Sequence, residues 1–310
     1  MTAGLAALVC GAPRDGASEA YRPRITAKTD VRMRDRFPPR RPRPALPVDA
    51  YESFYKEFDS PLLRQIRREA YGEDIGQHSW VTADELRADV SRLGLSASSR
   101  LIDLGCGPCG PLTFLLARAG CRGVGVDQSP SALRAGHARA QALGVIAQFS
   151  AQEADLDQRL PFDDATFDAA ISFDVVLHLV DRTNLFREVA RVLTPGTRFL
   201  FTDAGVVTGA VSNDEIQARS MYGHTQFVPI GWNERLLEEA GFRLVEQEDR
   251  TASALRNAGG RLAAVRAHRA ALTDAIGAAQ VDRQERNLET VVALARRSAL
   301  SRIMYVAESR

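Results

Sequence analysis

A strongly apolar run that breaks into three glycines constrains the fold more than any other part of this sequence. It reads LIDLGCGPCG, from Leu101 to Gly110, and its glycines follow the G-x-G-x-x-G spacing. That spacing lets a strand turn sharply into a helix while the backbone approaches a nucleotide closely. The glycines alone are weak evidence for any one ligand, so the surrounding residues decide which ligand this turn accepts.

The sequence after Arg100 alternates short β-rich runs with amphipathic segments, which is typical of a parallel sheet covered by helices on both faces. We therefore expect an α/β fold with a doubly wound, mostly parallel sheet of seven strands. The predicted strands cover residues 101–104, 123–126, 147–150, 169–173, 198–202, 243–247 and 302–306.

Three segments are expected along the chain. Residues 1–45 are rich in Arg and Pro and have no apolar periodicity, which predicts a disordered leader. Residues 46–95 have apolar residues at helical spacing and a capping box formed by Thr82 and Glu85, which predicts an N-terminal helical cap. Residues 96–310 form the main domain, with a helical insertion at about 252–298 that we expect to pack over the site.

Composition excludes several partners. The 310 residues have a net charge of +1, so no overall field favours nucleic acid or an anionic membrane. No apolar run approaches the ~18 residues of a membrane span. The four cysteines form no regular framework, and the Cys106-x-x-Cys109 pair has no second pair or nearby histidine. We expect a cytoplasmic protein without a metal site; its oligomeric state is left open.

The charges near the glycine turn favour a cationic ligand. Asp103 lies two residues before Gly105, where a carboxylate would repel a pyrophosphate and attract an ammonium or sulfonium group. Pro108 removes one N–H donor from the loop. Asp127 ends the second strand 22 residues after Gly105, where an acid can accept both ribose hydroxyls. These residues predict a nucleoside with a positively charged tail.

With these features the sequence resembles the class I S-adenosylmethionine-dependent methyltransferases over about residues 80–250. The stretches ADLDQRLPFDDATFDAAIS and EVARVLTPGTRFLFTD are similar to later segments of that family. The resemblance implies a Rossmann-like methyltransferase fold, S-adenosyl-L-methionine as cofactor, and contact between Asp155 and the adenine amino group. The implied cofactor residues are Asp103, Gly105, Cys106, Gly107, Asp127, Gln128, Asp155, Leu156 and Phe173.

Asp174 and His178 follow the fourth predicted strand, four residues apart, and would share one face of a helix. A histidine beside a carboxylate is a good proton acceptor near neutral pH, so we predict a catalytic pair. This spacing, with GEDI at residues 72–75, is similar to phosphoethanolamine and sarcosine/dimethylglycine N-methyltransferases. Ala204 replaces the tyrosine of the phosphoethanolamine enzymes, which argues against a phosphorylated substrate.

These observations predict a methyltransferase for a small molecule, with N-methylation of an amine favoured. The alternatives are O-methylation of a phenolic or carboxylate metabolite, a regulatory protein that binds the cofactor without catalysis, and, more remotely, a dehydrogenase. Polar and aromatic residues on either side of the main motifs are weaker candidates for substrate contact. They are Tyr71, Gln77, His78, Trp80, Tyr222, His224 and Trp232.

Overall fold

A computed structural model of the chain describes residues 52, 54–220 and 223–310. The predicted leader, the first residues of the predicted cap, and the substrate candidate Tyr222 lie outside these residues.

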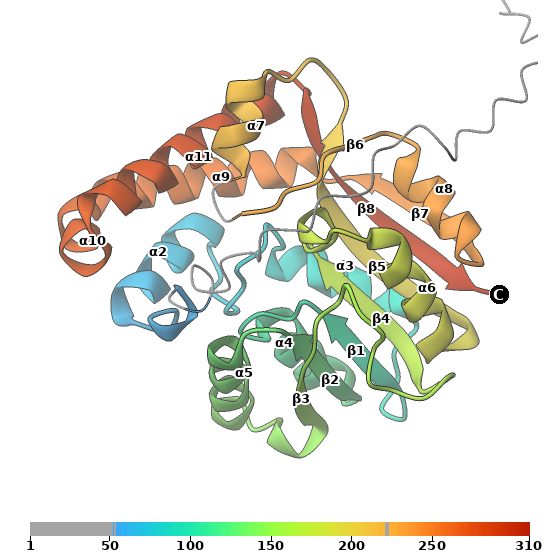
Figure 1. Cartoon of the computed structure of the whole chain (residues 1–310). Helices are drawn as coiled ribbons and strands as arrows, with labels where there is room; N and C mark the ends of the chain where they lie inside the picture. The colour runs from blue at the N-terminus through green and yellow to red at the C-terminus, as the bar shows by residue number, and fades with distance from the viewer. Residues whose placement is uncertain (1–51, 53, 221–222) are drawn as a thin grey trace, which may run out of the picture. The chain divides into compact units, whose positions relative to one another are not determined.

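One sheet organises the molecule, and its strands run in the order β3-β2-β1-β4-β5-β8-β7 (Figure 1). Strands β1 to β5 pair in parallel, whereas β8 is antiparallel to both β5 and β7. The order of the chain reverses between β1 and β4, and ligands of open α/β sheets bind at such a switch point. The strands are β1 (Arg100–Leu104), β2 (Arg122–Asp127), β3 (Phe149–Glu153), β4 (Phe167–Phe173), β5 (Leu193–Val207), β7 (Phe242–Asp249) and β8 (Leu300–Ser309).

The predicted doubly wound α/β fold is confirmed with all seven predicted strands, although β5, β7 and β8 are longer than expected. A two-residue strand β6 (Val228–Pro229) pairs with the end of β5 and makes the sheet eight-stranded. The third strand begins at Phe149 instead of 147, because Ile146–Gln148 form a 3-10 turn after the end of α5. Most of β3 is exposed at the sheet edge, so it lacks the apolar pattern that marks the inner strands.

Helices cover both faces of the sheet because side chains alternate along each strand. Leu101 of β1 packs in the cluster with α3 (Ala83–Leu93), α4 (Gly110–Ala119) and α5 (Pro130–Ala142). Its neighbour Ile102 packs in the opposite cluster, which α6 (Arg182–Val192) and α8 (Trp232–Glu239) complete. The predicted capping box at Thr82 and Glu85 begins α3, and Gly94 ends that helix in the left-handed conformation.

A third cluster of apolar side chains joins the cap helix α2 (Pro61–Tyr71) to the helices between β7 and β8. These helices are α9 (Thr251–Ala267), α10 (Arg269–Ile276) and α11 (Ala278–Arg296), and α7 (Asn213–Arg219) lies beside α11. In Figure 1 they form a separate group above the carboxyl ends of β1 and β4. The helical insertion therefore faces the edge of the sheet where ligands bind.

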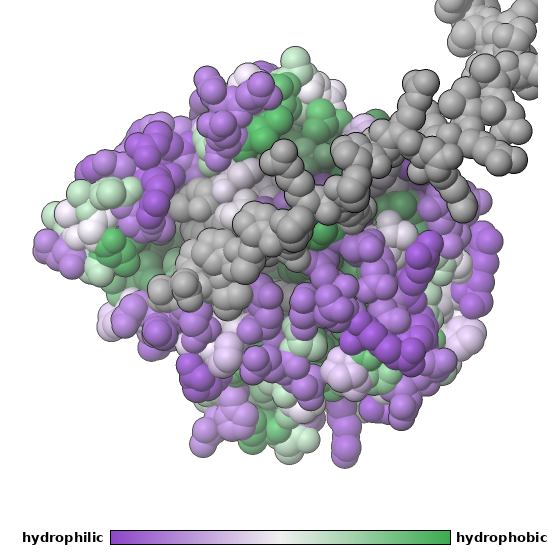
Figure 2. All heavy atoms as spheres, in the orientation of Figure 1, coloured by the Kyte–Doolittle hydropathy of each residue, from purple (hydrophilic) through white to green (hydrophobic). Residues whose placement is uncertain are grey.

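The visible surface of the lower half of the molecule, which holds α4, α5 and β3, is mainly hydrophilic in Figure 2. Among the described residues, no helix has the length and apolarity that crossing a membrane would need.

Candidate active site

The glycine turn joins β1 to α4 and is held against the end of β2. Gly105 and Cys106 both donate their N–H groups to the carbonyl of Val126, at 2.8 and 3.0 Å. Gly105 has a φ of +72°, and a Cβ atom there would lie 2.5 Å from the Val175 side chain. Only glycine adopts this backbone conformation readily and also leaves room for the turn after β4 to pack so closely against it.

Two carboxylates lie beside this turn. Asp127 accepts hydrogen bonds from the N–H groups of Gly107 and Ser129, both at 2.9 Å. Asp103 is 2% exposed, and its Oδ2 atom has no hydrogen-bond partner among the described residues. Burial, and then the charge of Asp127, raise the pKa of Asp103 well above its usual range. A buried carboxyl oxygen without a partner favours a ligand that brings a donor or a positive charge.

The segment after β3 reaches the same edge of the sheet. Ala154 donates its N–H to the carbonyl of Asp127 at 3.1 Å, so Asp155 follows directly beside the second-strand acid. Asp157 accepts from the N–H groups of Val180 and Asp181, at 2.9 and 2.8 Å, which ties this segment to the start of α6. The other residues expected at the cofactor include both buried and exposed positions: Cys106, Leu156 and Phe173 are buried, whereas Gln128 and Asp155 are exposed.

Residues ahead of α2 also contact the glycine turn, a contact that no sequence motif predicted. Glu52 accepts hydrogen bonds from Ser129 and Ser131, directly after Asp127. A Cβ atom on Gly107 would lie 3.2 Å from the Tyr55 hydroxyl, which bonds Nδ1 of His78 at 3.1 Å. The cap therefore borders the predicted cofactor site.

The expected Asp174–His178 pair does not form. Asp174 adopts a left-handed conformation with φ +59°, and a single 3-10 turn, Val176–His178, follows it. The two residues therefore do not share a helix face. The carboxylate of Asp174 instead accepts from the Trp80 N–H at 2.8 Å, the Thr202 hydroxyl at 2.8 Å and Nε of Arg302 at 2.9 Å.

His178 is oriented by a backbone carbonyl. Its Nδ1 atom lies 3.2 Å from the carbonyl oxygen of His224. Because a carbonyl can only accept, Nδ1 carries the proton and Nε2 carries the lone pair. Burial is the main reason that the pKa of His178 falls to about 4, and the positive charge of Arg219 also lowers it. The imidazole is therefore neutral at physiological pH.

The segment that carries His224 is held against the turn of His178. Gln226 donates its N–H to the carbonyl of Leu177 at 2.6 Å. Arg182 donates to the side-chain and main-chain oxygens of Gln226, at 2.8 and 3.0 Å, and forms a buried ion pair with Asp203. This network fixes the carbonyl that orients the His178 ring.

Several residues that were predicted to contact the substrate instead form hydrogen bonds within the cap. Both ends of the Gln77 amide bond its own loop, through the Ile75 N–H and the Glu73 carbonyl. The Tyr71 hydroxyl donates to the carbonyl of Ser79 at 2.9 Å. His78 stacks on Phe54, with ring centres 4.6 Å apart. Gln77 and Tyr71 thus have structural bonds that explain their burial without a ligand.

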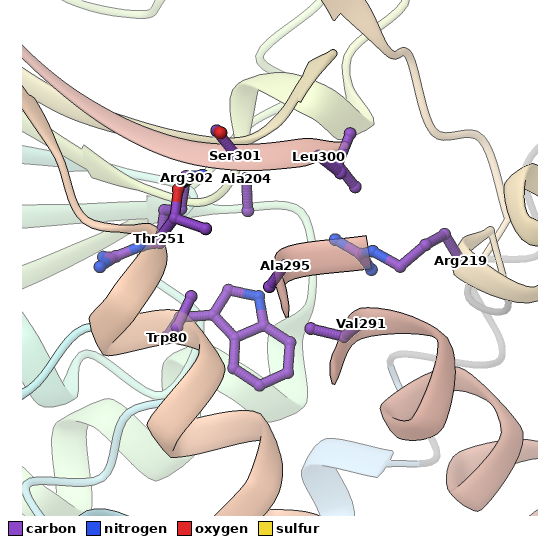
Figure 3. A pocket seen from close by; sticks show the side chains of 10 residues that line it. Trp80, Ala204, Arg219, Thr251, Val291, Ala295, Leu300, Ser301 and Arg302 are labelled. Atoms are coloured by element: carbon purple, nitrogen blue, oxygen red, sulfur yellow. Dashed lines mark hydrogen bonds between the residues drawn. The ribbon is translucent and has the colours of Figure 1, made fainter. Parts of the chain in front are cut away.

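A pocket opens between the third apolar cluster and the ends of β5 and β8 (Figure 3). The Trp80 indole forms one wall, and the guanidinium of Arg219 reaches toward the pocket from α7. Trp232, by contrast, is on the surface of α8, under the guanidinium of Arg235. The remaining pocket lining is mainly apolar and comes from β5, β8, α9 and α11: Ala204, Thr251, Ala254, Val291, Ala295, Leu300, Ser301 and Arg302.

Arg302 and Arg219 are the main site residues that sequence reasoning missed. Arg302 is 1% exposed and donates to Asp174 and, through Nη1, to both carboxylate oxygens of Glu85. An isolated arginine within the apolar strand run SRIMYV was the available signal, because a buried charge requires a partner. Nothing in the sequence near Arg219 marks it as part of a pocket.

The strand order, the single antiparallel strand β8, and the glycine turn with its two acids define the fold class of this protein. Its fold is that of the class I S-adenosylmethionine-dependent methyltransferases. Residues 102–201 match the family model described as a methyltransferase domain, so the chain contains such a domain.

Known proteins with related sequences carry the names of different methyltransferases. Methyltransferase GfsG of Streptomyces halstedii is 30% identical over 164 residues, which cover 51% of this chain and 58% of that protein. The O-methyltransferase resE of Aspergillus sclerotiorum is 32% identical over 173 residues, or 54% of this chain and 64% of that protein. The chain thus spans less than two thirds of either relative. Phosphoethanolamine N-methyltransferases of Triticum aestivum and Zea mays are also similar, as the sequence motifs predicted.

The fold matches solved structures over most of the chain. A crystal structure assigned as a sarcosine dimethylglycine methyltransferase of Galdieria sulphuraria has a TM-score of 0.71 and 18% identity, covering 84% of this chain and 97% of that one. This match confirms the predicted likeness at the level of the fold.

Proposed function

We propose that this protein transfers a methyl group from S-adenosylmethionine to a small molecule. The observation that carries the proposal is the buried Asp103 carboxylate, whose Oδ2 atom has no partner among the described residues beside the glycine turn. A dinucleotide would bring a pyrophosphate to this carboxylate, whereas S-adenosylmethionine would bring an ammonium group. The related methyltransferases support the same choice.

The residues present fit this cofactor. Asp103 would hold its cationic tail, the turn from Gly105 to Gly107 would allow close approach, and Asp127 would accept the ribose hydroxyls. Asp155, which follows the contact between Ala154 and Asp127, would meet the adenine amino group. When bound, the cofactor supplies an electrophilic methyl group and a good leaving group. The protein's own contribution is orientation, exclusion of water and control of the acceptor's proton.

His178 is the proposed proton acceptor, through the lone pair on Nε2. Its low pKa keeps the ring neutral, so the lone pair is present throughout the physiological pH range. Asp174 does not pair with His178 as expected. It bonds Arg302, Thr202 and Trp80, and thereby positions the turn that leads to His178. We therefore assign catalysis to His178 and positioning to Asp174.

We propose nitrogen as the acceptor atom, although relatives of this chain include N-, O- and sterol C-methyltransferases. The D-x-x-x-H pattern favoured an amine, and the phosphoethanolamine N-methyltransferases among the relatives support that choice. Two observations favour an oxygen acceptor as the second candidate. The ionic groups among the described residues that line the pocket are arginines, which oppose a bound ammonium, and two relatives are named O-methyltransferases.

Cofactor binding tests the proposal directly. By calorimetry we expect S-adenosylmethionine to bind and NAD not to bind. Asp127→Ala should weaken S-adenosylmethionine binding by about 1.5 to 3 kcal/mol, the usual contribution of hydrogen bonds to a charged group. Asp168→Ala is the matched control, because this aspartate bonds the Arg100 N–H at the start of β1, far along the strand from the glycine turn.

Two results would contradict the proposal in different ways. Tight NAD binding without S-adenosylmethionine binding would exclude the cofactor assignment. Binding of S-adenosylmethionine without transfer of its labelled methyl group to any member of a broad amine, phenol and carboxylate panel would favour the regulatory alternative.

A further inference from the structure

Two thiols lie side by side within the glycine turn, and the proposed transfer reaction uses neither of them. The Sγ atoms of Cys106 and Cys109 are 3.3 Å apart, and both residues are buried. The Cys109 N–H donates to the Cys106 carbonyl at 2.9 Å, which closes a tight turn. Such a turn keeps its first and last Cα atoms within about 7 Å, and a disulfide joins Cα atoms up to about 6.8 Å apart. The backbone thus already holds the two cysteines at a separation that suits a disulfide.

Glycines on two neighbouring elements make room for the sulfur atoms. A Cβ atom on Gly125 of β2 would lie 2.8 Å from the Cys106 Sγ and 2.9 Å from the Cys109 Sγ. A Cβ atom on Gly136 of α5 would lie 2.5 Å from the Cys109 Sγ. The sulfur atoms are therefore packed directly against the backbones of β2 and α5. Because this packing is close, a change in their positions must be taken up by the turn that carries them.

The Gly107 backbone links the two thiols to the acid that is proposed to hold the ribose. Both Sγ atoms lie 3.5 Å from the Gly107 carbonyl oxygen, to which a thiol is a weak donor. The N–H of the same glycine donates to Asp127 at 2.9 Å. A disulfide has no S–H group, and its formation would bring the sulfur atoms about 1 Å closer than they lie now. Gly107 would then lose both thiol donors, and its backbone would shift beside Asp127.

We propose that Cys106 and Cys109 form a reversible disulfide that lowers the affinity of the glycine turn for S-adenosylmethionine. This inference rests on the proposed function for the identity of the cofactor. By thermodynamic linkage, a disulfide that weakens cofactor binding is itself disfavoured to the same extent by bound cofactor. The turn is therefore most sensitive to oxidation when its cofactor site is empty.

A small hydroperoxide is the oxidant that suits so buried a pair. The Cys106 sulfur, the less deeply buried of the two, attacks a peroxide oxygen, and its proton passes to the departing oxygen as the O–O bond breaks. A sulfenic acid and an alcohol result, and the Cys109 sulfur then displaces water from the sulfenic acid to form the S–S bond. Two thiols and one hydroperoxide thus give one disulfide, one alcohol and one water.

The closed turn protects the thiols from this reaction. Burial, and then the hydrogen bond from Cys109, raise the pKa of the Cys106 thiol well above its usual range. A protonated thiol is a poor nucleophile, so oxidation requires the turn to open locally. The disulfide should therefore form slowly, over many opening events.

Cofactor affinity before and after oxidation tests the inference. The full chain is treated with hydrogen peroxide, the disulfide is identified from the masses of its peptides, and S-adenosylmethionine binding is measured by calorimetry. We expect oxidation to lower the affinity about 10-fold or more, the effect of losing a hydrogen bond to a charged group. Reduction with a phosphine should restore the affinity, which would exclude methionine oxidation as the cause.

Two variants show which cysteines are responsible. Cys121→Ser is the matched control, because Cys121 is buried directly before β2 and outside the glycine turn. This variant should show the full loss of affinity on oxidation. The double variant Cys106→Ser/Cys109→Ser retains Cys121 and should have the same affinity before and after peroxide treatment.

The Gly107 amide provides a measurement that needs no cofactor. Because its N–H is held by Asp127 in the reduced protein, its hydrogen exchange should become about 10-fold or more faster on oxidation. The Gly120 N–H is the control, since it bonds the Leu116 carbonyl at the far end of α4 and should exchange at an unchanged rate.

Failure of the Cys106–Cys109 disulfide to form, or an unchanged cofactor affinity once it has formed, would overturn the inference. If the reduced protein does not bind S-adenosylmethionine but Gly107 exchanges faster after oxidation, the proposed function fails and the redox-sensitive turn stands. If the reduced protein does not bind the cofactor and the exchange of Gly107 is also unchanged, both are overturned.

Discussion

At the scale of single residues, the protonation state of the proposed base depends on the burial of His178. The His224 carbonyl requires a proton on Nδ1, and burial holds the pKa of the ring at about 4. The negative charge of Asp174 acts in the opposite direction and raises this pKa slightly, although the two side chains do not bond. The pKa of this base is therefore determined by burial more than by a carboxylate partner.

His178→Ala should reduce turnover by about 100-fold or more and leave cofactor affinity unchanged, because it removes general base assistance alone. In the wild type, turnover should fall as the pH decreases through about 4, where the imidazole takes up its proton. Asp174→Asn should move this limb to lower pH, since a charge that raises the pKa is lost. If His178→Ala turns over normally at saturating acceptor, His178 has a structural role and is not the catalytic base.

The same pKa can be measured without an acceptor. The unfolded chain protonates His178 near pH 6.5, whereas the folded protein does so near pH 4. Between these values the unfolded state binds more protons, so this residue's contribution to stability is complete above pH 6.5 and is lost as the pH falls toward 4. His78, whose pKa burial also lowers, acts in the same direction. His178→Ala should therefore weaken, and not abolish, the pH dependence of the unfolding free energy.

At the scale of elements, the cap and the insertion meet where α2 crosses α9. Gly260 of α9 has no side chain at this contact, and a Cβ atom there would lie 2.7 Å from the carbonyl oxygen of Ala70. The adjacent Gly259 has no heavy atom within 4 Å of the same position. Close helix packing therefore depends on one of two neighbouring glycines.

We expect Gly260→Ala to destabilise the protein by about 1 to 3 kcal/mol, because the clash with a backbone carbonyl forces α9 away from α2. Gly259→Ala should instead stabilise it by about 0.5 to 1 kcal/mol, the ordinary gain from replacing glycine inside a helix. Denaturant unfolding of both variants measures the two effects. Equal stabilisation by both substitutions would show that the two helices can separate at no cost.

At the scale of the whole molecule, one buried arginine joins three parts of the fold. Arg302 on β8 contacts Glu85 of cap helix α3 and Asp174 at the end of β4, and it is almost fully buried. A second buried arginine, Arg250, pairs with Asp89 on the same helix α3. The cap is thereby attached to one end of the antiparallel pair formed by β7 and β8, where the end of β7 lies beside the start of β8.

Arg302→Met should lower the free energy of unfolding by about 3 to 5 kcal/mol, because it leaves the buried Asp174 carboxylate without its cation and removes the nearer of the two arginines that pair with Glu85. Arg243→Met is the matched control on the neighbouring strand β7. Its pair with Glu308 is largely exposed, with Arg243 55% exposed, and should contribute about 1 kcal/mol or less. Urea titration compares the two variants. A loss as small as that of Arg243→Met would show that Arg302 is dispensable to the attachment of the cap.

The sequence alone determined the α/β fold, the glycine turn, the two acids beside it and the helical insertion, because each depends on local spacing and periodicity. The bounds of edge strand β3 and the existence of the short β6 lacked such a signal, since exposed or two-residue strands carry little apolar pattern. The partner of Asp174 depended on tertiary structure: Arg302 lies 128 residues away along the chain and reaches it only because β8 inserts beside β5. Local spacing suggested that Asp174 pairs with His178, but the left-handed conformation of Asp174 and a buried arginine distant in the chain give this carboxylate other partners.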